Sequence, residues 1–231
     1  MPIYRLNETN LFPPVDHAEK GIVAVGGDLS TDRLIAAYQS GIFPWYSDQE
    51  PIIWWAPDPR FILYPENIKV SKSMKQLLKK KAFEVTFDTC FEKVIQACAK
   101  QKRKDQPGTW ITLEMEEAYL KLHELGLAHS VEVWSNENTN RKLVGGLYGV
   151  SLGSVFFGES MFHVESNASK YGFITLVEQL IQRDFKLIDC QMETPHLKSL
   201  GATSIPRKQF MLLLENGLQA PTFKGKWTDW L

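Results

Sequence analysis

Two polar side chains lie at the end of a predicted strand in the segment KLIDCQ, residues 186–191. Asp189 and Gln191 are two residues apart, so in an extended strand both project from one face, while Ile188 and Cys190 project from the other. A carboxylate beside a carboxamide can orient a neutral amine and hold a reacting carbonyl without forming a covalent intermediate. The alternative interpretation is that Asp189 and Gln191 only cap the strand end and the turn that follows it.

A third polar side chain, Glu159, comes directly after a glycine that ends a second apolar run at residues 155–157. Its neighbours are apolar and aromatic, and a carboxylate removed from water in such surroundings needs a hydrogen-bonding partner. Glu159 is therefore a candidate site residue; a turn at this point would instead direct its side chain into solvent. Residues 167–169 can cap a following helix, whose N-terminal amides attract a phosphate or an oxyanion.

Other common kinds of site have no support in the sequence. The five histidines show no HxxxH or HExxH spacing and the three cysteines form no CxxC pair, so we expect neither a metal site nor a disulfide framework. Cys190 is a poor partner for His196 as a thiol and base pair, because Cys190 faces away from Asp189 on the strand. The glycines at 145, 146 and 149 do not follow the GxGxxG order, and we attribute them to close approach of the backbone to a neighbour or ligand.

Basic and aromatic side chains are gathered locally. Six lysines and no acidic residue occur between Lys69 and Lys81, and a second basic cluster covers residues 100–104. Such runs can follow a nucleic-acid backbone, or they can form the solvated face of a helix. Tryptophans at positions 45, 54, 55 and 110 offer surfaces on which bases can stack, or they belong to the core.

The chain after residue 70 alternates predicted helices with short strands, which is typical of a mixed α/β domain. Ser73 and Gln76 form a capping-box pair, and apolar stripes at helical spacing predict two further helices over residues 91–98 and 115–122. A longer helix is predicted over residues 169–183, between the last two strands. The predicted strands cover residues 131–134, 143–150, 155–157 and 187–191. The last two strands and this helix form a strand, helix, strand crossover.

The first 70 residues have a different character. They hold most of the chain's 12 prolines, and because proline cannot donate a hydrogen bond to a sheet, we expect only short strands here. One helix is predicted to begin after Ser30 and to end at Gly41. We therefore expect a small N-terminal domain at residues 1–70 and a larger domain at residues 71–231.

The composition limits the class of protein. The chain has 231 residues, 44% of them hydrophobic, and a formal net charge of -1, which excludes a disordered chain and a protein held to nucleic acid by bulk charge. It has no signal-peptide core and no run of roughly 18 apolar residues, so we expect no membrane association. The cysteine pattern suits a reducing compartment, and we expect a cytoplasmic protein.

Eight sequence blocks, in the same order, make the chain resemble the bacterial leucyl/phenylalanyl-tRNA–protein transferases over nearly its whole length. The blocks are AVGGDL (24–29), GIFPWY (41–46), WWAPDPR (54–60), GTWIT (108–112), LVGGLYG (143–149), GESMF (158–162), NASK (167–170), and LIDCQ (187–191) followed by SLGA (199–202). Eight ordered blocks are far harder to match by chance than any one of them.

The resemblance implies an aminoacyltransferase that moves Leu or Phe, and Met less well, from aminoacyl-tRNA to the N-terminal α-amino group of proteins beginning with Arg or Lys. This transfer would mark the acceptor for degradation in the N-degron pathway. The implied fold is α/β, with a small N-terminal domain and a C-terminal domain like that of the acetyl-CoA-dependent N-acetyltransferases (GNAT-like), built on a mixed sheet. The implied partners are Leu-tRNA, Phe-tRNA and the acceptor proteins; we expect a monomer, no metal and no cofactor.

The same resemblance assigns roles to residues. It makes Asp189 and Gln191 the expected catalytic pair, with Gln191 hydrogen-bonding the attacking amine or the reacting carbonyl, and Asp189 polarising or orienting it. Trp45 and Trp110 are expected to pack around the terminal adenosine or the aminoacyl group, with Glu159 completing the polar wall. The expected apolar pocket for the amino acid consists of Leu147, Phe156, Met161, Leu176 and Ile188. The basic runs are expected to contact acceptor-stem phosphates, which fixes position and not base identity.

The sequence is also compatible with two other functions. An acyl-CoA N-acyltransferase would share the implied fold, but its usual Arg/Gln-x-x-Gly-x-Gly/Ala pyrophosphate loop is not found before the long helix. A non-catalytic RNA-binding module would use the lysines and tryptophans alone, and it would show steep salt dependence without aminoacyl transfer.

Overall fold

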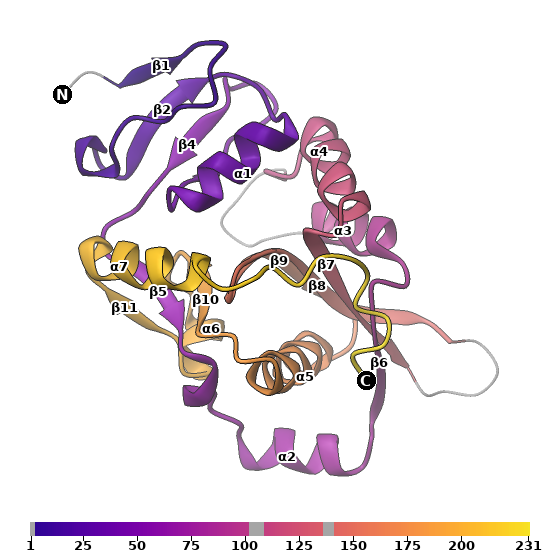
Figure 1. Cartoon of the computed structure of the whole chain (residues 1–231). Helices are drawn as coiled ribbons and strands as arrows, with labels where there is room; N and C mark the ends of the chain where they lie inside the picture. The colour runs from indigo at the N-terminus through magenta and orange to yellow at the C-terminus, as the bar shows by residue number, and fades with distance from the viewer. Residues whose placement is uncertain (1–2, 102–108, 136–140) are drawn as a thin grey trace.

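The computed structural model describes residues 3–101, 109–135 and 141–231. Within these residues the strands form two separate sheets, one of four strands and one of seven, and helices pack against them. The α/β class and the presence of a distinct N-terminal unit, both expected from the sequence, are confirmed. The small sheet lies at one end of the molecule, as the upper part of Figure 1 shows.

The small sheet consists of short strands from the proline-rich N-terminal segment. In spatial order its strands are β1 (Tyr4–Leu6), β2 (Ile22–Gly26), β4 (Ile53–Trp55) and β3 (Phe43–Pro44). β1 is parallel to β2, whereas β4 is antiparallel to both of its neighbours. The helix α1 (Thr31–Gln39) begins after Ser30, as predicted, and Gly41 follows it with a φ of +72°, a conformation that favours glycine.

The large sheet contains the four strands predicted after residue 70, two further strands in that part of the chain that the sequence pattern did not predict, and one strand from before residue 70. In spatial order its strands are β11 (Thr203–Ile205), β5 (Arg60–Leu63), β10 (Leu187–Gln191), β9 (Val155–His163), β8 (Leu143–Leu152), β7 (Ala128–Ser135) and β6 (Phe83–Phe87). β9 and β10 are parallel, and the other neighbouring strands of this described sheet are antiparallel. Helix α5 (Ala168–Gln182) joins β9 to β10, so the predicted crossover is confirmed.

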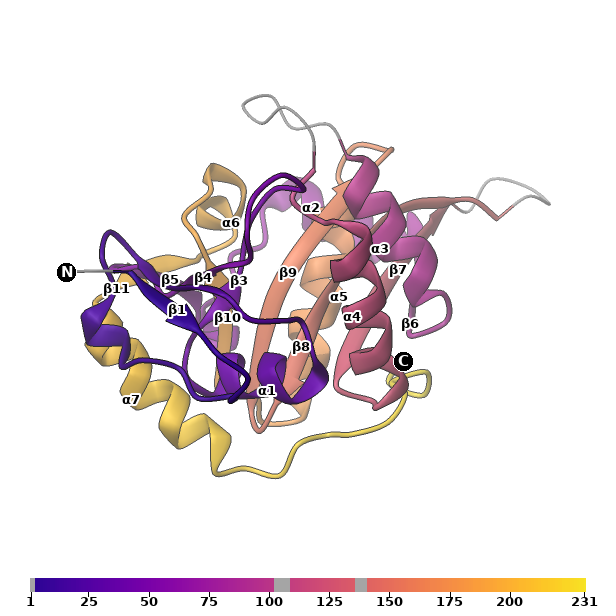
Figure 2. The same cartoon turned by 90° about the horizontal axis from the view of Figure 1, so that it is seen from above.

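Helices cover both faces of the large sheet. Successive residues of a strand point to opposite faces, and accordingly Phe156 packs in the cluster under α5 while Phe157 packs in the cluster on the other face. That other face is covered by α1 together with α3 (Phe91–Lys100), α4 (Leu113–Glu124) and α7 (Arg207–Leu218). Figure 2 shows α3 and α4 lying along the strands on the side away from α5. Among the helices of the described residues, none combines the length and the apolar composition of a membrane-spanning segment.

The start of helix α2 (Lys72–Lys79) differs from the prediction. The N-cap is Ser71 and not Ser73, because Ser71 has an extended backbone and its hydroxyl accepts a hydrogen bond from the amide of Met74 at 3.2 Å. Ser73 already lies in the first turn, where its hydroxyl contacts that of Ser71 at 3.0 Å. An extended backbone is what separates a capping residue from one inside the helix.

The chain passes from the small sheet to the large one between Trp55 and Arg60, since β4 belongs to the first and β5 to the second. This point lies ahead of the composition change near residue 70. The proline-rich segment continues through β5 and the 3-10 helix η2 (Pro65–Asn67), so composition and sheet membership change at different places.

Candidate active site

The parallel strands β9 and β10 separate before β9 ends. Their pairing joins residues 155–157 to residues 187–189, whereas β9 continues alongside β8 as far as His163. At Gln191 the backbone takes a φ of +62°, and the register of β10 against β5 shifts between Asp189 and Gln191. Such an irregularity re-aims the side chain that follows it. The two strands thus diverge where β9 carries Glu159 and β10 carries Gln191.

A cavity of about 620 Å³ opens at this divergence, lined by residues of both strands from the end of their paired stretch and from beyond it. It also receives side chains from β8, from α5 and from the segment after β3. The structure brings together in its lining most of the residues expected from the sequence: Trp45, Trp110, Leu147, Phe156, Glu159, Met161, Ile188 and Gln191.

Leu176 and Asp189 do not line the cavity, contrary to their expected places. Ser169 and Phe173, one turn apart near the start of α5, reach the cavity, and Leu176 lies further along the helix in the apolar core. Asp189 is fully buried behind the cavity wall. Sequence spacing places residues on a face of an element, but the length of the cavity along that face is set by the tertiary packing.

The Asp189 carboxylate forms a buried ion pair with Arg60 of β5. The guanidinium donates from Nε to Asp189 Oδ1 at 2.8 Å and from Nη2 to Oδ2 at 2.6 Å, which is the bidentate geometry of strong pairs. The guanidinium itself lies over the rings of Phe43 and Phe210, 4.8 and 4.5 Å from their centres. Asp189 Oδ1 also accepts a hydrogen bond from the backbone amide of Gln191 at 3.0 Å. Asp189 therefore holds the residue that reaches the cavity.

Glu159 is the centre of a hydrogen-bond network across the split between β9 and β10. Its Oε1 accepts from the amide nitrogen of Gln191 at 2.8 Å and from the hydroxyl of Tyr38 at 2.7 Å. Its Oε2 accepts from the hydroxyl of Tyr119 at 3.0 Å, and the Tyr38 and Tyr119 hydroxyls contact each other. The side-chain bond from Gln191 to Glu159 thus spans the two strands where their backbones no longer pair.

Burial gives this network unusual protonation equilibria. Burial raises the pKa of Glu159 to about 7, although the hydrogen bonds from Tyr38, Tyr119 and Gln191 act in the opposite direction. Burial and the charge of Glu159 raise the pKa values of Tyr38 and Tyr119 well above the ordinary value of 10.0. Both tyrosines therefore stay protonated at neutral pH and act as donors to Glu159.

The cavity has an apolar wall and a polar wall. Leu147, Phe156 and Ile188 belong to the apolar cluster beneath α5 and form one wall. Glu159 and Gln191 stand on the other side, with Trp45 and Trp110 from the face that carries the small sheet. Gln191 and Glu159 thus face the same cavity as Leu147, Phe156 and Ile188, whereas Asp189, the other member of the expected catalytic pair, does not line it.

Known sequences identify the group to which this architecture belongs. The profile of the family described as leucyl/phenylalanyl-tRNA protein transferase matches residues 62–215, and the profile of its N-terminal domain matches residues 27–58. The chain belongs to the leucyl/phenylalanyl-tRNA–protein transferase family. It is accordingly an aminoacyltransferase. The two profiles meet between residues 58 and 62, close to where the chain passes from the small sheet to the large one.

The transferase has relatives that match it almost from end to end. The leucyl/phenylalanyl-tRNA–protein transferase of Syntrophus aciditrophicus is 58% identical over 99% of this chain and 94% of its own length. The one from Maridesulfovibrio salexigens is 53% identical over 98% of this chain and 94% of its own length. Members of this family act on aminoacyl-tRNA and on protein acceptors, as their name states.

Solved structures similar to the transferase are distant. L-PGS from Bacillus licheniformis matches with a TM-score of 0.41 and 9% identity, over 70% of this chain and 65% of its own. The C-terminal domain of a putative lysylphosphatidylglycerol synthetase from Agrobacterium fabrum matches with a TM-score of 0.36 and 11% identity, over 85% and 59%. The family assignment therefore rests on the sequence relatives.

Three site residues of the transferase escaped the sequence reasoning. Tyr38 and Tyr119 lie on apolar helix stripes, where they are most simply interpreted as core. A buried tyrosine hydroxyl requires a partner, and this requirement was the available signal. Arg60 ends the WWAPDPR block, but nothing in local spacing connects it to Asp189.

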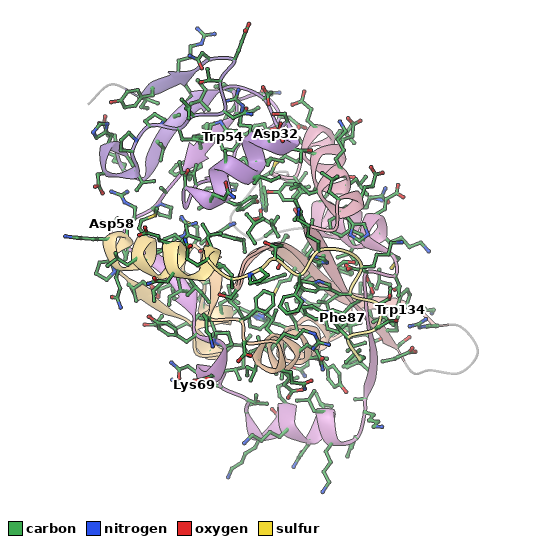
Figure 3. All side chains as sticks on the ribbon, viewed as in Figure 1. Asp32, Trp54, Asp58, Lys69, Phe87 and Trp134 are labelled. Atoms are coloured by element: carbon green, nitrogen blue, oxygen red, sulfur yellow. The ribbon has the colours of Figure 1, made fainter. Side chains whose placement is uncertain are left out.

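The lysine run of the transferase is solvent-exposed. All six lysines from Lys69 to Lys81 are exposed, and side chains with nitrogen tips project outward from α2, beyond the labelled Lys69 (Figure 3). The basic residues at 102–104 lie outside the described residues, as does Gly108 of the GTWIT block. No group of three or more metal-ligating side chains occurs in the part of the chain that the structure describes.

Proposed function

We propose that this transferase moves Leu or Phe, and Met less well, from aminoacyl-tRNA to the N-terminal α-amino group of proteins that begin with Arg or Lys, marking them for degradation. The observation that carries the proposal is a cavity in which an apolar wall stands opposite Gln191 and Glu159. An apolar amino acid fits the apolar wall, and an amine needs hydrogen-bond acceptors such as those on the side of Gln191 and Glu159.

The amino acid side chain is assigned to the apolar wall, against Leu147, Phe156, Met161 and Ile188. The terminal adenosine is assigned to Trp45 and Trp110, because indole rings are good surfaces for base stacking. The exposed lysines of α2 are assigned to the phosphates of the acceptor stem, where point charges bind without reading bases.

The chemistry required of the site is limited, because an aminoacyl ester is already activated. The acceptor's amine nitrogen attacks the ester carbonyl carbon, a C–N bond forms, the C–O bond to the ribose breaks, and the proton lost by nitrogen ends on the ribose oxygen. The reaction involves no net oxidation or reduction and needs no cofactor. Orientation and electrostatic stabilisation supply the acceleration.

Gln191 is assigned to orienting the acceptor amine. Its amide nitrogen is held by Glu159, so its carbonyl oxygen is the atom that it offers to an N–H of the amine. Asp189 acts as a positioning residue through the backbone amide of Gln191, and Arg60 fixes Asp189 in turn. Both residues of the expected acid-amide pair are thus given a role: Gln191 contacts the acceptor amine, and Asp189 orients Gln191.

The GNAT-like character of the large domain is part of the same proposal. A mixed sheet whose parallel pair diverges, with a crossover helix beneath it, supports this comparison. The domain limits at residue 70, the monomeric state and the cytoplasmic location stay predictions.

Transfer from labelled Leu-tRNA to a peptide beginning with Arg tests the function directly. We expect label in the peptide, and none in the same peptide with an acetylated N-terminus, which lacks a free amine. A peptide beginning with Ala tests the acceptor preference separately. Absence of labelling with tRNA and peptide that a known transferase uses efficiently would exclude the proposal.

A further inference from the structure

The last segment of the chain, residues 219–231, leaves α7 and runs across the molecule toward β6, as its yellow trace in Figure 1 shows. Two backbone contacts fix its course. The amide of Gly225 donates to the carbonyl of Gly126 at 3.2 Å, and the amide of Trp227 donates to the carboxylate of Asp88 at 2.8 Å. The segment is therefore held to the body of the protein at defined points.

Trp227 is the anchor of this segment and is 2% exposed. Its ring stacks on His129, with 3.5 Å between ring centres and 6° between planes, and on Trp230 at 3.7 Å and 10°. Asp88 binds both His129 and Trp227, because its Oδ2 lies 2.8 Å from His129 Nδ1 and accepts a hydrogen bond from the backbone amide of Trp227. Burial lowers the pKa of His129, so the imidazole is neutral and donates from Nδ1. Trp227 is thus held by a stacked ring on each face of its indole and by the hydrogen bond of its backbone amide.

The edge of this stack reaches the wall of the active-site cavity. The Trp227 ring contacts the ring of Phe156, with 6.1 Å between centres and 40° between planes. Phe156 lines the cavity, whereas Trp227 lies behind it. Phe156 therefore separates the C-terminal segment from the space assigned to the amino acid side chain.

The Phe156 ring also lies close to the backbone of the neighbouring strand β8. A Cβ atom placed on Gly149 of β8 would lie 2.5 Å from Phe156 Cζ and 2.8 Å from Cε1, so the ring lies directly over the glycine backbone. Together with the backbone oxygen of Phe157, 2.3 Å from the same Cβ position, this close approach explains the last glycine of the LVGGLYG block. Gly149 and Trp227 together fix where the cavity wall stands.

We propose that Trp227 determines the depth of the cavity through Phe156, and thereby the preference between a branched aliphatic and an aromatic amino acid. This inference rests on the proposed function and extends it to a residue outside the cavity. A smaller side chain at 227 allows the Phe156 ring to move back, which deepens the cavity and favours Phe over Leu. A hydrophobic pocket discriminates by about 10- to 200-fold per methylene, so a change of about tenfold in preference is expected.

The experiment compares Trp227→Leu and Trp227→Phe with the matched control Trp230→Leu. Trp230 belongs to the same stack but sits on the outer side, against Phe87 and Trp227. The measured quantity is the ratio of kcat/KM for Phe-tRNA to that for Leu-tRNA, together with the thermal midpoint of each variant. Binding of non-hydrolysable amide analogues of phenylalanyl- and leucyl-adenosine gives the same ratio without transfer, so a failure of the proposed transfer reaction is seen separately.

We expect the Phe to Leu ratio to rise about tenfold in Trp227→Leu and less in Trp227→Phe, while Trp230→Leu loses stability without a change in ratio. In a double-mutant cycle, Phe156→Leu should remove most of the effect of Trp227→Leu, because the two changes act through one wall. An unchanged ratio in folded Trp227→Phe and Trp227→Leu, additive effects in the cycle, or an equal ratio change in Trp230→Leu would overturn the proposal.

Discussion

The carboxylates of Glu159 and Asp189 both hold Gln191, but they have different neighbours. Asp189 faces the guanidinium of Arg60, whereas Glu159 faces neutral donors, namely two tyrosine hydroxyls and the amide of Gln191. A cation stabilises a carboxylate more than neutral donors do, and burial disfavours the charge. Burial raises the pKa of Glu159 to about 7, so this carboxylate titrates near neutral pH.

Transfer activity should therefore fall as the pH drops through about 7, the pKa of Glu159. Two tyrosine hydroxyls and the amide of Gln191 donate to this carboxylate. A proton added to the carboxylate takes the place of one of these donors, and the hydrogen bonds that hold Gln191 are disturbed. In Glu159→Gln this fall in activity near pH 7 should disappear. The acceptor amine also titrates, but equally for both proteins, so the measurement is the ratio of their kcat/KM values between pH 6 and pH 8. A ratio that stays constant over this range would contradict the assignment.

The same group should make stability depend on pH. Between its ordinary pKa of 4.5 and its folded pKa of about 7, Glu159 keeps a proton in the folded state that the unfolded chain has released. Its contribution to the free energy of unfolding is therefore present below pH 4.5, falls as the pH rises through this window, and is constant above it. Urea unfolding of the wild type and of Glu159→Gln at pH 5, 6, 7 and 8 measures the difference, and parallel curves would refute the prediction.

Removing the cation of the buried pair should be costly. Arg60→Met leaves Asp189 buried without its partner, and we expect a loss of about 3–5 kcal/mol in the free energy of unfolding. The double variant Arg60→Met with Asp189→Asn removes both charges and should be more stable than Arg60→Met alone. Denaturant unfolding of the three proteins provides the test; equal stability of the single and double variants would show that the unpaired carboxylate is not the cause.

At the scale of elements, the divergence of β9 and β10 creates the site. The strands separate after Phe157 and Asp189, and the side chains two residues further on, Glu159 and Gln191, bond to each other across the split. Gln191→Ala removes this bond and the carbonyl oxygen assigned to the amine. We expect turnover to fall at least tenfold while the affinity for tRNA stays nearly unchanged, which single-turnover kinetics and tRNA titration distinguish. A similar loss of affinity would make Gln191 a docking residue instead.

Helix α2 lies far from the small sheet and carries lysines on a solvent-exposed face (Figure 1). Lys72, Lys75 and Lys79 are spaced so that they share one side of the helix. If these lysines contact phosphates, replacing all three by Ala should make the fall of log affinity with log salt shallower by about 2–3, since each phosphate contact contributes about 0.9 to its steepness. Lys224 and Lys226, which lie in the C-terminal segment, provide a control pair of exposed lysines. An unchanged slope in the α2 variant would leave these lysines as a solvated face.

At the scale of the whole molecule, the C-terminal segment crosses the turn at Gly126. A Cβ atom on Gly126 would lie 2.2 Å from the backbone nitrogen of Gly225, and its φ of +67° also favours glycine. Gly126→Ala should therefore loosen the segment and speed tryptic cleavage after Lys224 and Lys226. Gly158→Ala is the matched control, because a Cβ atom there meets ordinary contact at 3.6 Å. Equal cleavage of both variants would show that the segment is held elsewhere.

The sequence by itself determined the helices after Ser30 and Cys90, the strand, helix, strand crossover, and the family, because apolar periodicity and ordered blocks are local properties. Only the tertiary structure decided which polar groups meet. Arg60 reaches Asp189 across 129 positions and Tyr38 reaches Glu159 across 121. A buried charge or hydroxyl takes its partner from whichever element packs beside it, and no local spacing records that choice.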